Sequence, residues 1–172
     1  MKPEPLPGIP GAYLMRPRVH SDERGSFLEI FREDVLGTKF VQANHSHSKA
    51  GVLRGLHWHR HQADAWYVIS GQAQAMLADL RRPSPQPAVA SVDLDSHEPL
   101  VLFIPPGVAH GFLALTDVDL IYWVTEYYDA SDEFGVAWDD PTLNAPWKAD
   151  SPILSERDKG NPKLEWEAID PS

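Results

Sequence analysis

The chain has 172 residues, 42% of them hydrophobic and 23% charged, a composition typical of a globular protein. A chain of this length can bury one sizeable core but is too short for two domains of usual size. Its formal net charge of -10 argues against a nucleic-acid backbone as a partner, although it leaves room for a local basic pocket that binds a small anion. The absence of cysteine excludes disulfides, thiolate metal ligands and a cysteine nucleophile.

The N-terminal stretch MKPEPLPGIPGAYLM carries prolines and an acid where a secretory signal would need an apolar run. No later window is long and apolar enough to span a membrane. We therefore expect a cytoplasmic protein without a membrane partner. Residues 1–20 should form an N-terminal arm that ends in a first strand, AYLMRPRVH.

Short segments with strand-like patterns follow one another from residue 21 to residue 128. SFLEIF alternates apolar and polar residues as a half-buried strand does, and FVQANHSHS, AVASVDLDS, GFLALTD and LIYWVTEYY are similar. QAQAMLADLR suits either a strand or a helix. This series predicts an all-β protein in which residues 21–128 form a jelly-roll barrel with a small ligand in its mouth.

The region 129–172 is rich in turns and tryptophans, and we expect it to wrap around the barrel. Within it, SERDKG has the signals of a short helix, with Ser155 as the N-cap and acids in the first turn. The sequence thus predicts one domain over residues 1–172, with a short helical segment near its C-terminal end.

Candidate catalytic and metal-binding side chains are concentrated in GVLRGLHWHRHQADAWYVISG, residues 51–71. An extended strand would project His57, His59 and His61 from one face, and Asp64 follows them closely. Later, the turn in FIPPGVAHGF delivers His110 to the start of another apolar segment. Imidazoles beside a carboxylate suit proton transfer or metal binding, so we expect the two stretches to form one site.

Further motifs occur in an order that resembles one enzyme family. The dTDP-4-dehydrorhamnose 3,5-epimerases have motifs similar to RGLHW at 54–58, GQAQAMLADLR at 71–81, IPPGVAHGFLAL at 104–115, YWVTEYYDASDEFGVAWDDP at 122–141 and ILSERD at 153–158. DERGSFLEIF and FVQANHSHSKAGVLRG precede them in the family's order. The resemblance covers about residues 22–158. It implies a cupin-type jelly roll, commonly a homodimer, that acts on a nucleotide-linked 4-keto-6-deoxyhexose without metal or organic cofactor.

The resemblance also implies roles for single residues. Epimerisation beside a ketone needs a base that removes the α-proton, a group that holds the enolate oxygen, and an acid that returns the proton on the other face. His57 matches the family's base, Asp158 the carboxylate that orients this base, and Tyr122 the acid. The positions that match the family's substrate-binding residues are Arg24, Phe27, Glu29, Gln42, Asn44, Arg54, His110, Tyr128, Glu133 and Arg157. Of these, Tyr128 would stack on the nucleotide base and the arginines would hold the diphosphate.

Two further positions in the expected substrate site depart from the family's pattern. Asp64 stands where these epimerases carry a lysine close to the sugar, so a cation has become a carboxylate. His59 stands where the family often has a glutamine. The two changes leave the exact reaction open.

With these changes, His57, His59, Asp64 and His110 resemble the metal-binding motif of metal cupins, with Asp64 in place of the usual glutamate. Three imidazoles and a carboxylate suit a divalent transition metal, which could replace the lysine as an electrophile. The two interpretations compete for His57, because a metal-bound imidazole is not a free base. A site without metal or cofactor is our first interpretation, and the metal site is the alternative.

The sequence therefore predicts an epimerase of a nucleotide-diphosphate 4-keto-6-deoxyhexose in deoxysugar biosynthesis, acting by proton abstraction and return at C3, C5 or both. The alternatives are a metal-dependent cupin enzyme, either an isomerase or an oxygenase, and a non-catalytic sugar-nucleotide binding protein. Besides the nucleotide sugar, the expected partner is a second copy of the chain, since the N-terminal segment could exchange between two barrels.

Overall fold

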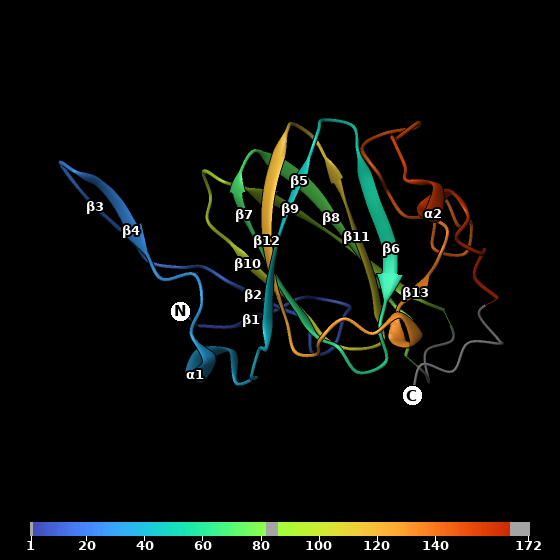
Figure 1. The fold of residues 1–172 in the computed structure, drawn as a ribbon, viewed down its shortest axis with the longest axis horizontal. Helices are drawn as coiled ribbons and strands as arrows, with labels where there is room; N and C mark the ends of the chain where they lie inside the picture. The colour runs from blue at the N-terminus through green and yellow to red at the C-terminus, as the bar shows by residue number, and fades with distance from the viewer. Residues whose placement is uncertain (1, 82–85, 166–172) are drawn as a thin grey trace.

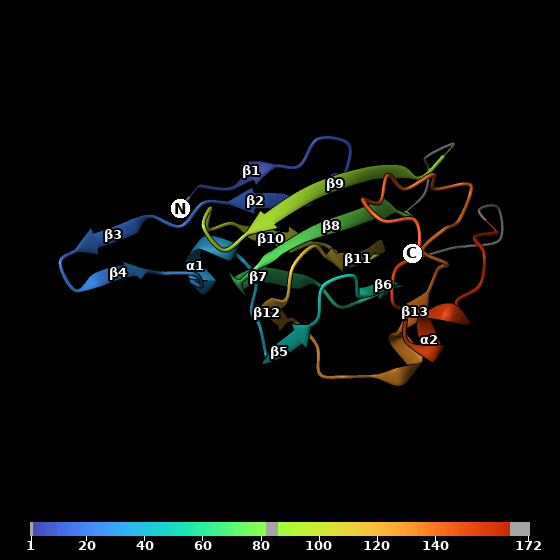
Figure 2. The ribbon, with the colours of Figure 1, turned by 90° about the horizontal axis from the view of Figure 1, so that it is seen from above.

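Two antiparallel sheets face each other and form the body of the protein, as the computed structural model in Figures 1 and 2 shows. The structure describes residues 2–81 and 86–165. In spatial order, the larger sheet consists of β1 (Glu4–Pro5), β2 (Tyr13–Met15), β10 (Val101–Ile104), β7 (Asp64–Ser70), β12 (Val118–Val124) and β5 (Gln42–Ser48). The second sheet consists of β13 (Phe134–Gly135), β6 (Leu53–Trp58), β11 (Val108–Ala114), β8 (Gln72–Asp79) and β9 (Ala88–Asp95).

This architecture confirms the predicted all-β jelly roll. The segment QAQAMLADLR, which suited a strand or a helix, forms β8, because β9 and β11 flank it and take up the hydrogen bonds on both of its edges. Its side chains are buried on both faces from Ala73 to Asp79, which explains why the segment lacks a clear alternation.

The main core lies between the two sheets, where apolar side chains from both inner faces meet. Its larger members include Trp66, Leu77, Leu102, Phe112 and Leu120, all less than 10% exposed. The rings of Trp66 and Phe112 meet edge to face at 5.8 Å between centroids. The core thus fixes β7 of one sheet against β11 of the other, and both strands also carry side chains of the candidate site.

A two-stranded ribbon of β3 (Val19–Asp22) and β4 (Gly25–Leu28) lies outside both sheets and projects from the body (Figure 1). The segment SFLEIF is predicted to form a half-buried strand. The predicted burial and length are wrong, because Phe27 is 66% exposed and β4 ends at Leu28. Alternation reports that one face is apolar, but it does not report whether the same chain covers that face. The structure does not place the start of the barrel at residue 21 as predicted. β2, which precedes that residue, already belongs to the larger sheet, whereas the ribbon of β3 and β4 does not.

Three short helical turns complete the described chain: α1 (Glu33–Leu36), η1 (Ala130–Asp132) and α2 (Glu156–Lys159). α2 confirms the helix predicted at SERDKG, and the Ser155 hydroxyl oxygen accepts a hydrogen bond from the backbone N–H of Asp158 at 3.1 Å. Sequence reasoning missed α1, which is a single turn. Residues 166–172 of the predicted C-terminal wrap lie outside the described part of the chain. Among the residues described, none of the helices has the length and apolar character needed to cross a membrane.

Gly55 permits a close approach of β6 and β11 beneath the candidate site. Its φ is +123°, and a Cβ built there would lie 2.7 Å from the Cα of Gly111 and 2.9 Å from the backbone oxygen of His110. Both contacts are to backbone, so they cannot be relieved by turning a side chain. Any larger residue must push the two strands apart.

We expect Gly55→Ala to lower the free energy of unfolding by roughly 2–4 kcal/mol, since the clash adds to the backbone strain. Gly8→Ala is the matched control, because Gly8 also has a positive φ, +83°, but nothing lies within 4 Å of its added Cβ. Urea unfolding of both variants measures the difference. Equal losses of stability would contradict the role of close strand contact.

Candidate functional site

A cavity of about 490 Å³ opens between the two sheets. Side chains from β5, β6, β7, β11 and β12 form its walls, and residues between Tyr128 and Asp158 close one side. The lining includes most of the predicted site residues, namely Gln42, Asn44, Arg54, His57, His59, Asp64, His110, Tyr122, Tyr128, Glu133, Arg157 and Asp158. The structure therefore gathers residues more than a hundred positions apart around one ligand-sized space.

Three predicted residues do not line this cavity. Arg24 and Phe27 lie on the projecting ribbon, and the exposed Glu29 follows it. The Arg24 guanidinium pairs with the carboxylate of Asp22 at 2.5 Å rather than with any residue of the cavity. Within one chain these three residues do not reach the cavity, because the ribbon points away from the barrel (Figure 1). Their expected part in substrate binding stays a prediction.

His57 is held by a buried carboxylate. Its Nε2 lies 2.6 Å from Oδ1 of Asp158, whose side chain is 5% exposed, and the backbone N–H of Gly55 donates to the other oxygen at 3.4 Å. Burial would raise the pKa of Asp158, but the hydrogen bond and charge of His57 outweigh burial and lower it. An ionised Asp158 accepts a hydrogen bond from Nε2–H of His57, which leaves Nδ1 of His57 as the basic nitrogen.

Tyr122 reaches the cavity from the opposite sheet. It lies on β12 between Leu120 and Val124, which line the same cavity by strand alternation, and it is half-buried. Burial raises the pKa of Tyr122, and the negative charge of Asp64 raises it further. The phenol therefore keeps its proton at neutral pH. Because β6 and β12 belong to different sheets, a ligand between them has an imidazole on one side and a phenol on the other.

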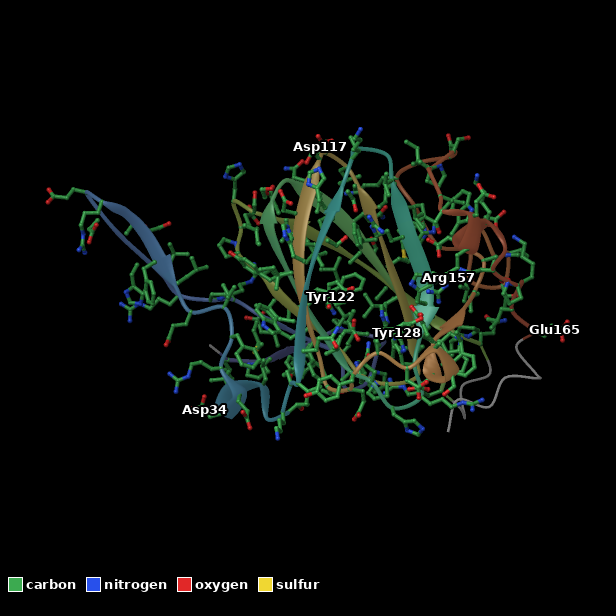
Figure 3. All side chains as sticks on the ribbon, in the orientation of Figure 1. Asp34, Asp117, Tyr122, Tyr128, Arg157 and Glu165 are labelled. Carbon is green, nitrogen blue, oxygen red and sulfur yellow. The ribbon has the colours of Figure 1, made fainter. Side chains whose placement is uncertain are left out.

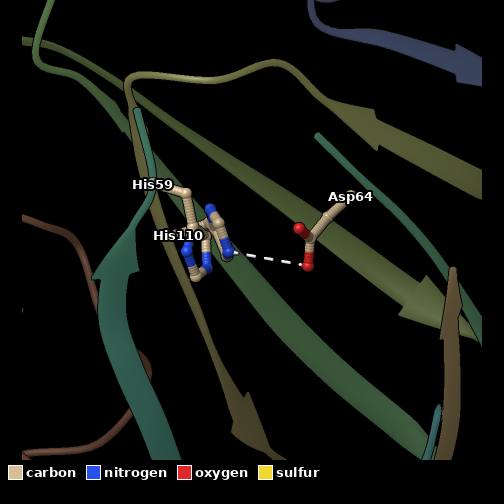
Figure 4. Close-up of side chains that lie close together, drawn as sticks. All are labelled: His59, Asp64 and His110. Atoms are coloured by element: carbon tan, nitrogen blue, oxygen red, sulfur yellow. Dashed lines mark ion pairs between the residues drawn. The ribbon is translucent and has the colours of Figure 1, made fainter. Parts of the chain in front are cut away.

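A second group of side chains lies deeper in the same cavity. One potential ligand atom each of His59, Asp64 and His110 lies within 4.8 Å of the other two (Figure 4). Nε2 of His110 is 3.8 Å from Oδ2 of Asp64. Burial lowers the pKa of His110 to about 4, against the opposing effect of the Asp64 charge, so His110 is neutral at pH 7. His57 does not belong to this group, which separates the proposed base from the other two histidines of the predicted metal set.

The donors on Asp64 were not predicted from the sequence. The side-chain amide of Gln62 donates to Oδ1 at 2.8 Å, and the indole N–H of Trp66 donates to Oδ2 at 3.2 Å. Asp64 is 3% exposed, so these two bonds compensate in part for its lost hydration. Asp64, which stands where the family's pattern has a lysine, is thus a fixed part of the cavity wall.

The prediction that three imidazoles share one face holds for two of them. β6 ends at Trp58, and the chain then bends, so His59 still lines the cavity while His61 is exposed. The Asp132 carboxylate accepts the backbone N–H groups of Arg60 and His61 at 2.9 and 3.1 Å and holds the bend in place. A period of two predicts positions only as far as the strand continues.

Cationic and aromatic side chains surround the open side of the cavity. Arg157 pairs with Glu133 at 2.8 Å, and Tyr128 is 71% exposed (Figure 3 labels Tyr128 and Arg157). Arg54 donates from Nε to the hydroxyl oxygen of Ser48 at 2.8 Å and leaves part of its guanidinium exposed. This rim offers a flat ring and two guanidinium groups, which suit a base and a diphosphate.

The cavity also includes residues that sequence reasoning did not identify. They are Ser46, Gln62, Trp66, Gly111, Phe112, Leu120, Val124 and Ser155. Most lie two positions from a predicted site residue on the same strand, as Trp66 does from Asp64 and Leu120 does from Tyr122. Strand alternation from the predicted residues is the signal that could have found them.

Comparisons with known proteins agree on one family. A family model described as dTDP-4-dehydrorhamnose 3,5-epimerase matches residues 7–165. The dTDP-4-dehydrorhamnose 3,5-epimerase of Methanothermobacter thermautotrophicus is 40% identical over 163 residues, which cover 88% of this chain and 88% of that protein.

Solved structures extend the agreement to the fold. A 4-keto-6-deoxy sugar epimerase from the novobiocin biosynthetic gene cluster of Streptomyces spheroides superimposes with a TM-score of 0.88 at 31% identity, covering 95% of this chain and 87% of that one. The dTDP-6-deoxy-D-glucose-3,5-epimerase of Legionella pneumophila, in complex with dTDP-4-keto-L-rhamnose, gives a TM-score of 0.83 at 34% identity, covering 92% and 89%.

Proposed function

Because the chain belongs to the dTDP-4-dehydrorhamnose 3,5-epimerase family, we propose that it epimerises a nucleotide-diphosphate 4-keto-6-deoxyhexose at C3, C5 or both. The observation that carries this proposal is the pairing of His57 with buried Asp158 on one side of a cavity and protonated Tyr122 on the other. A base and an acid on opposite faces of a bound sugar are what inversion beside a ketone requires.

In the proposed reaction, Nδ1 of His57 removes the proton from the carbon beside the ketone. The electron pair of that C–H bond moves toward the carbonyl, and an enolate forms. Tyr122 then donates its phenolic proton to the opposite face of the same carbon, and the pair of electrons returns from the oxygen to form the new C–H bond. The resulting imidazolium and phenolate exchange protons with solvent to regenerate the starting state. Asp158 stabilises the imidazolium while it exists.

We propose no organic cofactor for these steps, because imidazole and phenol carry the proton themselves. Arg54 lies in the same cavity and contributes positive charge near the developing enolate. Gln42, Asn44 and Glu133 offer amide and carboxylate groups to the sugar hydroxyls. These assignments follow from the cavity and from the family's pattern together.

The nucleotide would lie at the open rim of the cavity. Tyr128 can stack on a base because its ring is largely exposed, and Arg157 lines the same cavity with a guanidinium suited to phosphate oxygens. The Arg157 side chain is already oriented by Glu133, which lowers the entropy lost when it binds an anion. A small anionic ligand thus meets local positive charge on a chain with a formal net charge of -10.

A homodimer would give the projecting ribbon a function. An isolated two-stranded ribbon is marginal in water, and this one exposes Val19 and Phe27 together with Arg24. We propose that it packs against a second copy of the chain and carries Arg24, Phe27 and Glu29 to the cavity of that copy. The homodimer and the cytoplasmic location stay predictions.

Mixing two inactive variants tests this arrangement. In a hybrid of Arg24→Ala and His57→Asn subunits, one cavity would have both a native ribbon and a native His57, so a refolded equimolar mixture should regain about a quarter of wild-type activity. Each variant alone is the control. If every ribbon serves its own cavity, the mixture will stay as inactive as its components.

The function itself is tested with dTDP-4-keto-6-deoxyglucose and product analysis by proton NMR. New sugar signals with inverted coupling at C3 or C5 would identify an epimerase and the carbon on which it acts. Binding of the nucleotide sugar without any conversion would contradict the proposal and favour a non-catalytic binding protein.

A further inference from the structure

We propose that His59, Asp64 and His110 form a binding site for one divalent transition-metal ion on the inner wall of the cavity. The group consists of two imidazoles and one carboxylate with ligand atoms within 4.8 Å of one another (Figure 4). His57 is not a ligand in this site, so the sequence-level conflict between a base and a metal ligand does not arise.

The hydrogen bonds of the two histidines fix which nitrogen faces the group. Nδ1 of His110 donates to the backbone oxygen of Val108 at 2.8 Å, and Nδ1 of His59 donates to the backbone oxygen of Asp132 at 2.7 Å. A carbonyl oxygen can only accept, so each Nδ1 carries a proton, and in the neutral ring each Nε2 carries a lone pair. A ring N–H bonded to a backbone carbonyl is the usual arrangement of metal-binding histidines.

Hydrogen bonds also orient the carboxylate of Asp64. Gln62 donates to one oxygen of Asp64 and Trp66 to the other, which orients the carboxylate and leaves its remaining lone pairs for a cation. Asp64 is 3% and His110 6% exposed, so water does not screen them well. The atoms that face one another in this group are two imidazole lone pairs and a carboxylate oxygen, all acceptors. Three converging acceptors are stabilised by a shared cation.

The spacing suits an ion after a small adjustment. Bonds of about 2.0–2.2 Å from nitrogen and oxygen to zinc-like ions place neighbouring ligand atoms about 3–3.5 Å apart. Two ligand atoms at the 4.8 Å limit of the group must therefore approach each other by about 1.3–1.8 Å, whereas Nε2 of His110 and Oδ2 of Asp64 start at 3.8 Å. Rotation of His59, the least buried of the three, can supply much of this change. Two imidazoles and one carboxylate suit Fe²⁺, Mn²⁺, Co²⁺ or Zn²⁺ rather than Ca²⁺ or Mg²⁺.

The position of the site gives the ion a possible part in the reaction. His110 is the direct cross-strand neighbour of His57 in the pairing of β11 with β6, and both line the cavity. An ion held there would add positive charge beside the ketone and stabilise the enolate as a Lewis acid. This extension rests on the proposed epimerase function, whereas the binding site itself does not.

The test is metal binding to the purified chain after treatment with a chelator. Titration with Zn²⁺ followed by calorimetry should give one equivalent per chain, and Co²⁺ should give visible absorption typical of mixed nitrogen and oxygen ligands. Asp64→Asn and His110→Gln should weaken binding by at least tenfold, or about 1.4 kcal/mol. Thermal unfolding and dTDP binding would establish that both variants are folded.

Asp119→Asn is the matched control. Asp119 also meets two histidines, His45 at 2.9 Å and His47 at 3.0 Å, but all three lie at the surface. This variant should keep the full equivalent of ion. The proposal is overturned if the wild type binds no ion, or if the ion is lost in Asp119→Asn and kept in Asp64→Asn.

Proton exchange into substrate, measured with and without Zn²⁺, separates the two claims. Faster exchange in the loaded protein supports participation of the ion in the reaction. Equal exchange overturns that participation and leaves the binding result to stand by itself. If exchange is absent in both states, the proposed epimerase function fails, whatever the calorimetry shows.

Discussion

His57→Asn is expected to lower epimerase activity by roughly 10²–10⁴-fold, since it removes the imidazole base that the Asp158 carboxylate orients in the cavity. The backbone N–H of Gly55 still donates to Asp158 in this variant, so the buried charge keeps a partner and the fold should survive. Steady-state kinetics with dTDP-4-keto-6-deoxyglucose measures the loss, and calorimetry with dTDP should show nearly unchanged binding.

His61→Asn is the control for this change. His61 lies on the same stretch of chain, but it is exposed and does not line the cavity. It should retain wild-type activity within about twofold, as surface substitutions usually do. An equal loss in both variants, or a fully active His57→Asn, would exclude His57 as the base.

Tyr122→Phe should separate the two halves of the reaction. Without the phenol, His57 can still remove the proton, but nothing returns one to the opposite face, so net epimerisation should fall by about 10²–10⁴-fold. In deuterated water, deuterium should still enter the substrate with its starting configuration, because the imidazolium can return a deuteron to the face from which it took the proton. NMR for isotope and configuration measures both rates in one sample.

Tyr127→Phe provides the comparison, because Tyr127 is 70% exposed and not part of the cavity lining. It should epimerise as the wild type does. If Tyr122→Phe loses exchange and epimerisation to the same extent, Tyr122 positions the substrate or the base instead of returning the proton.

Much of this site could be predicted because strands repeat every two residues and because the motifs occur in a family's order. Tyr122 and Asp158 needed the family resemblance, since a tyrosine in an apolar strand and an acid at a helix start are common for other reasons. The structure adds the hydrogen bond between His57 and Asp158, which are 101 positions apart, and it places Tyr122 in the lining of the same cavity. No local pattern reports such a distance.

Two features lay beyond the sequence for physical reasons. Alternation in SFLEIF could not tell that β4 leaves the barrel, because an apolar face can be buried by another copy of the chain as well as by its own. The different surroundings of His57 and His59 depend on hydrogen bonds to Asp158 and to the backbone oxygen of Asp132, which lie 101 and 73 positions away along the chain. Spacing alone grouped His57, His59 and His110 in one predicted metal set.

Asp64 connects the two proposals. In the family's pattern a lysine would supply a cation here, and in this chain a carboxylate with two fixed donors faces two imidazole lone pairs. Such a carboxylate would repel an enolate if it stood unneutralised. A bound ion reverses the sign of the charge at this position, which makes the substitution compatible with the proposed reaction.

The most direct test of the central claim is proton NMR of dTDP-4-keto-6-deoxyglucose incubated with the wild-type protein in deuterated water. The proton signal at C3, C5 or both is expected to disappear as deuterium enters from solvent, and inverted sugar is expected to appear. If the protein binds the nucleotide sugar while both proton signals persist, with and without added divalent ions, the epimerase account is contradicted.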